Sequence, residues 1–342
     1  MRPFIEIDGS QGESGGQMLR TALSLSAVSG RPFRIHSIRA KRKKPGLMRQ
    51  HLTCVTSAQA ICDAQVKGAA LSSSTVTFVP EKIAHGDRAI AIGTAGSTAL
   101  VLQTVVPPLL VAEGRSRIVL SGGTHNPMAP TADFLIRAFV PTLRKMGAIV
   151  DVRCNRPGFY PAGGGELVLE VQGGHALTPV SLLERGRVQR IEARAYVDQL
   201  PATIGHRELL VVRDRLKLPR ERLRVVELKG AGPGNCVVVD VVCDGGTEVV
   251  SVLGERGRTS EDVAGDVADS VDAFVAANVP VGEHLADQLL IPMALAGGGT
   301  FKTMTPTEHT RTNIAIVKLF LDVEIDLVEA ADGTATITVR PR

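Results

Sequence analysis

The sequence predicts an α/β (α+β) fold, with a large domain of three repeated helix-pair/β-sheet units and a smaller inserted α/β domain. Three segments share one order of extended entry, polar or glycine-bearing turn, apolar helix, glycine stop and strand. A second helical pattern and another β-like run follow each of them. The segments cover 6–35, 90–120 and 278–304, and the second helical patterns cover 47–65, 130–147 and 309–320. Self-similarity at this scale indicates one supersecondary unit used three times, and alternating strands and helices are typical of this fold class.

The first helix of each unit is apolar on nearly all of its faces. In the second unit it reads "ALVLQTVVPPLLVA" (99–112), where Gln103 is the only side chain that carries an amide. A helix that is apolar all round is buried on every side. We therefore expect helices at the centre of the large domain and sheets outside them.

The pattern changes between 184 and 279. A charged, alternating strand (185–200) precedes an amphipathic helix (202–218), and two β-like runs flank a Gly-Gly turn at 245–246. An amphipathic helix with an acidic start follows at 260–277. This stretch separates the second unit from the third. The sequence thus predicts a large domain formed by 1–183 and 280–342, with an inserted small domain at 184–279.

Charge and aromatic content limit the classes of function. The 342-residue chain has a net charge of only +4, which is too balanced for nonspecific coating of nucleic acid. However, no Asp or Glu occurs from Ser14 to Cys62, while Lys and Arg occur nine times there, as expected of a local site for a polyanion. With no Trp, two Tyr and nine Phe, stacking along a run of bases is disfavoured. A nucleic-acid ligand would be recognised by its phosphates or by its end.

The cysteines and the N-terminus indicate the compartment. Five scattered Cys show no zinc-ligand spacing, and reduced core thiols predict an intracellular, cytoplasmic protein. The chain begins with a strand and turn, without the apolar core of a signal peptide. No apolar run reaches membrane-spanning length, so we expect no membrane partner.

The chain lacks both of the common glycine-rich phosphate loops, but two other motifs stand out. "GFYPAGGGE" (158–166) has three consecutive glycines, which suit either backbone N–H groups facing an anion or a close approach of two chain segments. "TPTEHTRTN" (305–313) matches a capping box at Thr305 and places His309 in the first turn of a helix. The helix dipole there favours a neutral, nucleophilic imidazole. A structural hydrogen bond is the alternative role for this histidine.

Three further features have both structural and functional interpretations. In "GEHLADQ" (282–288), Asp287 is either a helix N-cap or a ligand of ribose or a metal-bound nucleotide. "SGGTHNPMAPTADF" (121–134) is a turn that opens a helix, with Thr131 or Asp133 as the cap. Glu13 is the last acid before the basic region, and it forms either an ion pair or a site for a divalent metal brought with a nucleotide.

Taken together, these motifs resemble those of the RNA 3'-terminal phosphate cyclase family, and the resemblance runs essentially from end to end. Six motifs in order carry it. They are "DGSQGESGGQMLRTALSLSA", "IRAKRKKPGLMRQH", "GGTHNPMAPTADF", "GFYPAGGGE", "GEHLADQLLIPMALA" and "EHTRTN". The family contains ATP-using cyclases and inactive relatives involved in ribosome assembly. The active branch keeps a histidine at the start of the last helix, which is His309 here.

The resemblance implies a reaction in three steps. His309 attacks the α-phosphate of ATP and forms a covalent histidine-AMP, the AMP passes to the 3'-phosphate of RNA, and the 2'-OH closes a 2',3'-cyclic phosphate. The implied partners are RNA ends with a 3'-phosphate, ATP and a divalent metal (Mg²⁺ or Mn²⁺), with a homodimer as a candidate assembly. The implied fold, three βαβαββ-like units and an inserted domain, agrees with the pattern.

The resemblance also implies site residues by their position in the motifs. Glu13 would be the metal or active-site carboxylate. The clamps for ATP phosphates and the RNA end would be Arg20, Arg39, Arg42, Gln50 and His51. The nucleotide pocket would be formed by Gln103, Pro130, Phe134, His284, Leu285, Ala286, Asp287 and Gln288. His284 occupies a position where some members carry an aromatic residue.

Two other functions compete with this hypothesis. A noncatalytic RNA-binding or ribosome-assembly factor would be favoured by loss of His309, which is present. An enolpyruvyl-transferase-like enzyme has a related repeated architecture, but a small phosphorylated substrate needs fewer cations than this chain supplies.

The basic stretch 38–51 is expected to continue a strand, turn at Pro45-Gly46 and start a helix. On a strand, Arg39 would face away from its neighbours. Arg39 and Arg42 are the expected phosphate contacts. Three lysines of the stretch (Lys41, Lys43 and Lys44) are expected to form a solvated rim that attracts RNA.

Overall fold

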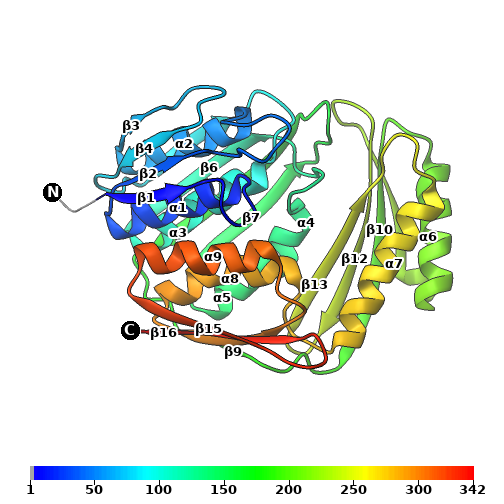
Figure 1. Ribbon diagram of the computed structural model, residues 1–342. Coiled ribbons are helices and arrows are strands. Elements are labelled where there is room, and N and C mark those ends of the chain that lie inside the picture. The colour runs from blue at the N-terminus through cyan, green and yellow to red at the C-terminus, as the bar shows by residue number, and fades with distance from the viewer. Residues whose placement is uncertain (1–3) are drawn as a thin grey trace.

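The computed structural model describes residues 4–342 and contains one sheet topology three times (Figure 1). In each unit the sheet has the strand order first, second, fourth, third. The first two strands are parallel, and the others pair antiparallel. The sheets are β1-β2-β4-β3, β5-β6-β8-β7 and β9-β14-β16-β15. The prediction of three repeated α/β units is confirmed.

The elements of the units follow the predicted order. The first unit is β1 (Ile5–Asp8), α1 (Gln17–Ser29), β2 (Phe33–His36), α2 (Arg49–Cys62), β3 (Gln65–Lys67) and β4 (Val76–Val79). The second is β5 (Gly86–Ala91), α3 (Thr98–Val111), β6 (Gly114–Gly122), α4 (Ala132–Phe134), the π-helical η1 (Leu135–Phe139), α5 (Val140–Lys145), β7 (Ile149–Arg156) and β8 (Gly165–Gly173). The third is β9 (Ser181–Leu182), α8 (Glu283–Leu295), β14 (Gly299–Thr303), α9 (Glu308–Phe320), β15 (Val323–Glu329) and β16 (Ala335–Pro341).

The first helices of the units form the centre of the large domain. In α1, Leu19 and Leu23 are fully buried, and α1 packs against α3 and α9. Figure 1 shows the helices lying between the sheet of the first unit and the sheet of the third. This arrangement confirms the expectation of buried helices with sheets outside, and it gathers the N-terminal ends of several helices.

The insertion interrupts the third unit between β9 and α8. It comprises β10 (Val188–Asp198), α6 (Ala202–Leu216), the 3-10 turn η2 (Arg220–Arg222), β11 (Leu223–Leu228), β12 (Gly234–Cys243), β13 (Gly246–Leu253) and α7 (Ser260–Ala277). Its sheet has the order β11-β10-β12-β13, and Figure 1 shows it at one side of the large domain. Side chains alternate along β12. Val237 and Val239 pack in the insertion's own core, whereas Cys236 and Val238 join the main core. The domain limits 1–183, 184–279 and 280–342 stay predictions.

Some local expectations were wrong. β2 ends at His36, and Arg39 lies in a turn with a left-handed φ of 56° rather than on a strand. The alternating pattern continues past residue 36, but Ile38 N–H bonds Ser74 O and the Gly46 N–H bonds Ile38 O, which folds the segment back. All five cysteines are free, and no helix within 4–342 combines the length and hydropathy required to cross a membrane.

A buried carboxyl group links the insertion to the third unit. Glu248 of β13 is 7% exposed and lies against Gly282, the N-cap of α8, where a Cβ atom would fall 2.3 Å from Glu248 Oε1. Glu248 Oε2 has no hydrogen-bond partner within the described residues. Burial raises the pKa of Glu248 to about 8, against the opposing effect of the Gly282 N–H group. The folded protein therefore holds a proton here at neutral pH.

This proton makes stability fall with rising pH. Above the ordinary pKa of 4.5 the unfolded chain releases the proton while the folded chain keeps it, so unfolding becomes easier up to about pH 8. The slope is at most about 1.4 kcal/mol per pH unit. Between pH 6 and pH 8, we expect the urea concentration at the unfolding midpoint to fall less in Glu248→Gln than in wild type. Glu255→Gln, at an exposed carboxylate that does not act on the pKa of Glu248, should retain the wild-type slope. Equal slopes in wild type and Glu248→Gln would contradict this assignment.

Candidate active site

His309 lies in the first turn of α9, as expected, and 53% of its side chain is exposed. The helix is capped by Thr307, whose hydroxyl accepts the Thr310 N–H bond, and not by Thr305. Thr305 instead donates its hydroxyl to Gly333 O. The capping-box prediction was therefore wrong by two residues, but it placed the imidazole correctly at the helix start.

Gln17, at the start of α1, fixes the orientation of this imidazole. His309 Nδ1 lies 2.5 Å from Gln17 Oε1, and Gln17 Nε2 donates to Asp287 Oδ2. Because the Gln17 amide turns its NH₂ group to the carboxyl, its carbonyl oxygen faces His309 and accepts a bond from Nδ1–H. The lone pair of a neutral His309 is then on Nε2. No role had been predicted for Gln17, although it lies within the first motif.

Asp287 is inside α8 rather than at its N-cap, so that structural interpretation was wrong. Burial raises the pKa of Asp287 to about 7, while Arg20 and the bond from Gln17 act in the opposite direction. Asn313 Nδ2 also donates to the backbone oxygen of Asp287 at 3.1 Å. Through its carboxyl and its backbone oxygen, Asp287 thus joins α8 to α1 and to α9.

Side chains of α8 divide between the site and the core. His284, Asp287 and Gln288 share one helical face, because they are spaced by three and four residues. Gln288 Oε1 accepts a bond from Gln103 Nε2 of α3, which brings Gln103 to the same place. The intervening Leu285 and Ala286 are 4% and 1% exposed and pack in the core. The structure therefore does not bring the side chains of Leu285 and Ala286 to the site face.

Glu13 lies beside His309 in the loop that precedes α1. Its Oε1 accepts the Gln17 N–H bond at 3.3 Å, and its Oε2 lies 2.9 Å from Arg42 Nη2 and 4.0 Å from His309 Nδ1. Both the expected ion pair and a carboxylate close to His309 are present. No cluster of three His, Cys, Asp or Glu residues suited to a metal occurs within residues 4–342. A metal here would need ligands from a bound nucleotide.

His51 and Arg20 meet at the N-terminus of α1. Burial, with the nearby charges of Arg20 and Arg39, lowers the pKa of His51 to about 3, so this imidazole is neutral. His51 Nδ1 accepts the Met48 N–H bond at 3.3 Å, which leaves the proton on Nε2. A Cβ atom on Gly16 would lie 2.3 Å from His51 Nε2 and 2.8 Å from Arg20 Nη1. The bare backbone of Gly16 thus allows both donors to approach the helix end.

The arginines and lysines of the basic stretch 38–51 differ in their contacts. Arg39 donates to the backbone oxygens of Lys44 and Gly46 at 2.6 and 3.0 Å, and Arg42 pairs with Glu13. Both arginines are half-buried, whereas the three lysines of the predicted rim (Lys41, Lys43 and Lys44) are exposed. The turn at Arg39, rather than a strand, directs its guanidinium into the stretch's own backbone.

The other predicted residues differ in their contacts and burial. Gln50 accepts the Ser97 N–H bond at 2.7 Å and so joins α2 to the start of α3. Pro130 is half-buried, and the Phe134 side chain is 2% exposed within the core. Thr131 caps α4, as one of the two predicted caps. The structure thus gathers most predicted residues but leaves the Phe134 ring inside the core.

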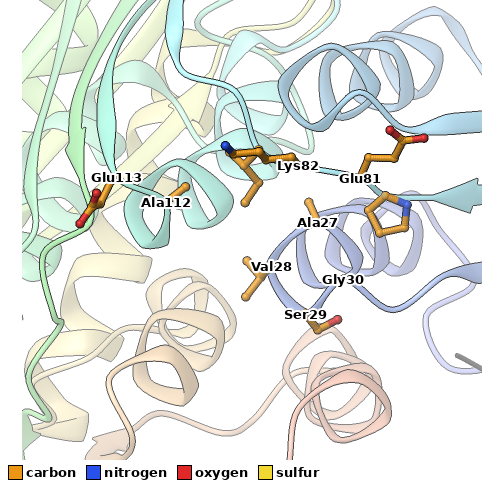
Figure 2. A pocket seen from close by; sticks show the side chains of 10 residues that line it. Ala27, Val28, Ser29, Gly30, Glu81, Lys82, Ala112 and Glu113 are labelled. Carbon is orange, nitrogen blue, oxygen red and sulfur yellow. The ribbon is translucent and has the colours of Figure 1, made fainter.

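A separate pocket of about 700 Å³ lies at the other end of α1 (Figure 2). Figure 2 shows Ala27, Ser29, Lys82 and Glu113 around it. None of the predicted site residues lines this pocket. Its lining comes from the C-terminal ends of α1 and α3 and from residues 80–83 after β4, away from the helix starts that carry His309 and its neighbours.

The fold and this centre define a class of protein. It is a three-unit α/β repeat protein that presents the exposed imidazole of His309 among arginines and helix N-termini. Helix N-termini and guanidinium groups both favour anions, phosphate above all. The chemistry of these groups suits a phosphate ligand beside a nucleophilic nitrogen.

Comparison with known proteins agrees with this class. The family model described as RNA 3'-terminal phosphate cyclase matches residues 11–327. The chain is 46% identical over 340 residues to the RNA 3'-terminal phosphate cyclase of Ectopseudomonas mendocina, with 99% of each chain covered. It is 47% identical to that of Koribacter versatilis (95% of this chain and 92% of the relative) and 45% identical to that of Salmonella agona (97% and 96%). The chain belongs to the RNA 3'-terminal phosphate cyclase family.

Proposed function

We propose that this protein is an ATP-dependent enzyme that converts an RNA 3'-terminal phosphate to a 2',3'-cyclic phosphate through a covalent histidine-AMP. The relatives' names supply the overall reaction. The observation that carries the mechanism is the geometry of His309, whose Nδ1 is held by Gln17 while its ring is half exposed at a helix start. A noncatalytic RNA-binding factor would need no such fixed imidazole.

In the first step, His309 Nε2 attacks the α-phosphorus of ATP, and the bond to the β-phosphate oxygen breaks to release pyrophosphate. Positive charge then develops on the imidazole, and Nδ1–H binds the Gln17 carbonyl more strongly. Asp287 holds the other end of the Gln17 amide. These two residues therefore stabilise the charged ring as the adduct forms.

In the second step, an oxygen of the RNA 3'-phosphate attacks the adenylate phosphorus, and the nitrogen–phosphorus bond breaks. In the third, the adjacent 2'-oxygen attacks the activated 3'-phosphorus, loses its proton and expels AMP. A phosphate monoester has a poor leaving group, and AMP is a good one. Arg20, Arg42 and the neutral His51 would bind the phosphates during these steps.

Glu13 suits a divalent metal that arrives with ATP. Each oxygen of its carboxylate has two acceptor positions, so the bonds from Gln17 N–H and Arg42 leave room for a cation. Mg²⁺ often uses one or two carboxylates and substrate phosphates. Such a metal would neutralise phosphate charge. Gln103, Pro130, His284 and Gln288 would surround the nucleoside.

The overall reaction is tested on an RNA oligonucleotide with a labelled 3'-phosphate. With ATP and Mg²⁺ or Mn²⁺, we expect the label to become resistant to phosphatase, because a cyclic diester is not a substrate for that enzyme. A matched RNA that ends in 3'-OH should be unchanged in length and charge. Continued phosphatase sensitivity with both metals would refute the proposed reaction.

A further inference from the structure

The loop that carries "GFYPAGGGE" is held firmly at both ends. It connects β7 to β8, where the Gly158 N–H bonds Thr124 Oγ1 at 2.9 Å and Thr124 N–H bonds Gly158 O at 2.8 Å. Phe159 is buried and stacks on the His125 ring at 5.2 Å, and the Gly163 N–H bonds Phe159 O at 2.6 Å. The residues between these anchors form a short, fixed tip.

The glycines of this loop serve close approach of chain segments. A Cβ atom on Gly163 would lie 3.0 Å from Ala95 Cα, and one on Gly164 would lie 2.5 Å from Ala231 Cβ. The loop is therefore wedged between the second unit and the insertion. This favours the second of the two interpretations of the three glycines, and it leaves Tyr160 at the tip without an explanation.

Tyr160 is 65% exposed, although the chain has few aromatic side chains. Within residues 4–342, the other exposed aromatic side chain is Phe4 at 45%, at the start of the first unit. The remaining Phe residues are buried, and Tyr196 is half-buried with its hydroxyl donating to Asp133. An exposed ring on a fixed loop loses little conformational freedom when it binds a ligand, so it is well suited to stacking.

A series of contacts connects this loop to the phosphate centre. Gly163 touches Ala95, and Ser97 two residues further on binds Gln50, the neighbour of His51. Three exposed cations lie along the same segments, and none of them has an acidic partner within residues 4–342. They are Arg49, Arg156 and Lys229. Arg156 donates to Gly164 O of the loop itself.

We propose that Tyr160 stacks on a nucleobase near the 3' end of the RNA, while the adjacent cations hold the backbone that leads to His309. This inference rests on the proposed function and assigns the RNA part of that site. Stacking on an aromatic ring is tolerant of base identity, and the cations supply attraction without sequence readout. A single exposed ring matches a protein that binds an end rather than a run of bases.

The test compares wild type, Tyr160→Ala, Tyr160→Phe and the matched control Phe4→Ala on a ten-nucleotide RNA with a 3'-phosphate. Loss of one stacked base weakens binding about tenfold. We expect Tyr160→Ala to raise KM for RNA by about that factor, while its labelling by ATP without RNA is unchanged. Tyr160→Phe and Phe4→Ala should behave as wild type. An RNA with abasic sites in its last positions should remove the difference between wild type and Tyr160→Ala.

Fluorescence gives a second readout that needs no catalysis. The chain lacks Trp, and Tyr160 is the more exposed of its two tyrosines, so its emission should fall when the RNA is added. The quenching should vanish in Tyr160→Phe. If wild type converts no RNA but this quenching occurs, the reaction fails and the stacking surface stands. An unchanged KM in Tyr160→Ala, or quenching that persists in Tyr160→Phe, overturns the inference.

Discussion

Replacing His309 by alanine will lower the rate of RNA 3'-phosphate conversion by at least about a thousandfold, because it removes the nucleophile itself. His51 cannot replace it, since His51 is buried and its Nε2 carries the proton. Binding of ATP should be largely retained because the arginines stay. The measurement is single-turnover conversion of RNA with a labelled 3'-phosphate.

His175→Ala is the matched control, because His175 is an exposed histidine between β8 and β9 with no contact to the centre. It should convert RNA at the wild-type rate. If His309→Ala retained more than about a tenth of wild-type activity, His309 would not be the nucleophile.

Replacing Gln17 by methionine will lower the rate of adenylation by about a hundredfold while leaving the KM for ATP nearly unchanged. Methionine has a similar length but cannot accept the His309 Nδ1–H bond or donate to Asp287. The ring then loses both its orientation and the preference for a lone pair on Nε2, and loss of such a tautomer-fixing partner is costly in histidine-dependent enzymes. Burst measurements of histidine labelling would separate this effect from ATP binding.

Gln11→Met tests whether any change in this loop has the same effect. Gln11 is exposed in the loop before α1 and makes no contact with His309. This variant should label at the wild-type rate. Gln17→Glu retains an acceptor for Nδ1–H but places a second carboxylate beside Asp287, which would raise the pKa of Asp287 further, so this variant should label faster than Gln17→Met and slower than wild type. A Gln17→Met variant that changed only the KM for ATP would contradict a positioning role.

The repeated architecture could be predicted because its signals are local. Each first helix is apolar on all faces, and the same order of turn, helix and glycine recurs around it. The segment at 37–44 could not be predicted, because the alternation that suggests a strand continues there. Its turn is decided by backbone bonds to Gly46 and Ser74. The position of β9 in the third sheet could not be predicted either, because its partner β14 follows the whole insertion.

Some site residues could be predicted from local motifs, and others could not because their partners are distant in the sequence. His309, Glu13 and Arg42 could be named from motifs, and the structure brings them together. Gln17 was missed because its role depends on partners near the opposite end of the chain. The motif also contains Leu285 and Ala286, but helical geometry turns His284, Asp287 and Gln288 to the site and these two residues to the core.

The central claim is a covalent AMP on His309, and the most direct measurement is labelling with ATP that carries a radioactive α-phosphate. In the presence of a divalent metal and without RNA, we expect label on the protein that resists alkali and is released by acid, as for a phosphoramidate. Peptide mapping should place it on the segment that contains His309, and RNA with a 3'-phosphate should discharge it. No label, or equal labelling of His309→Ala, would show that His309 does not carry the AMP.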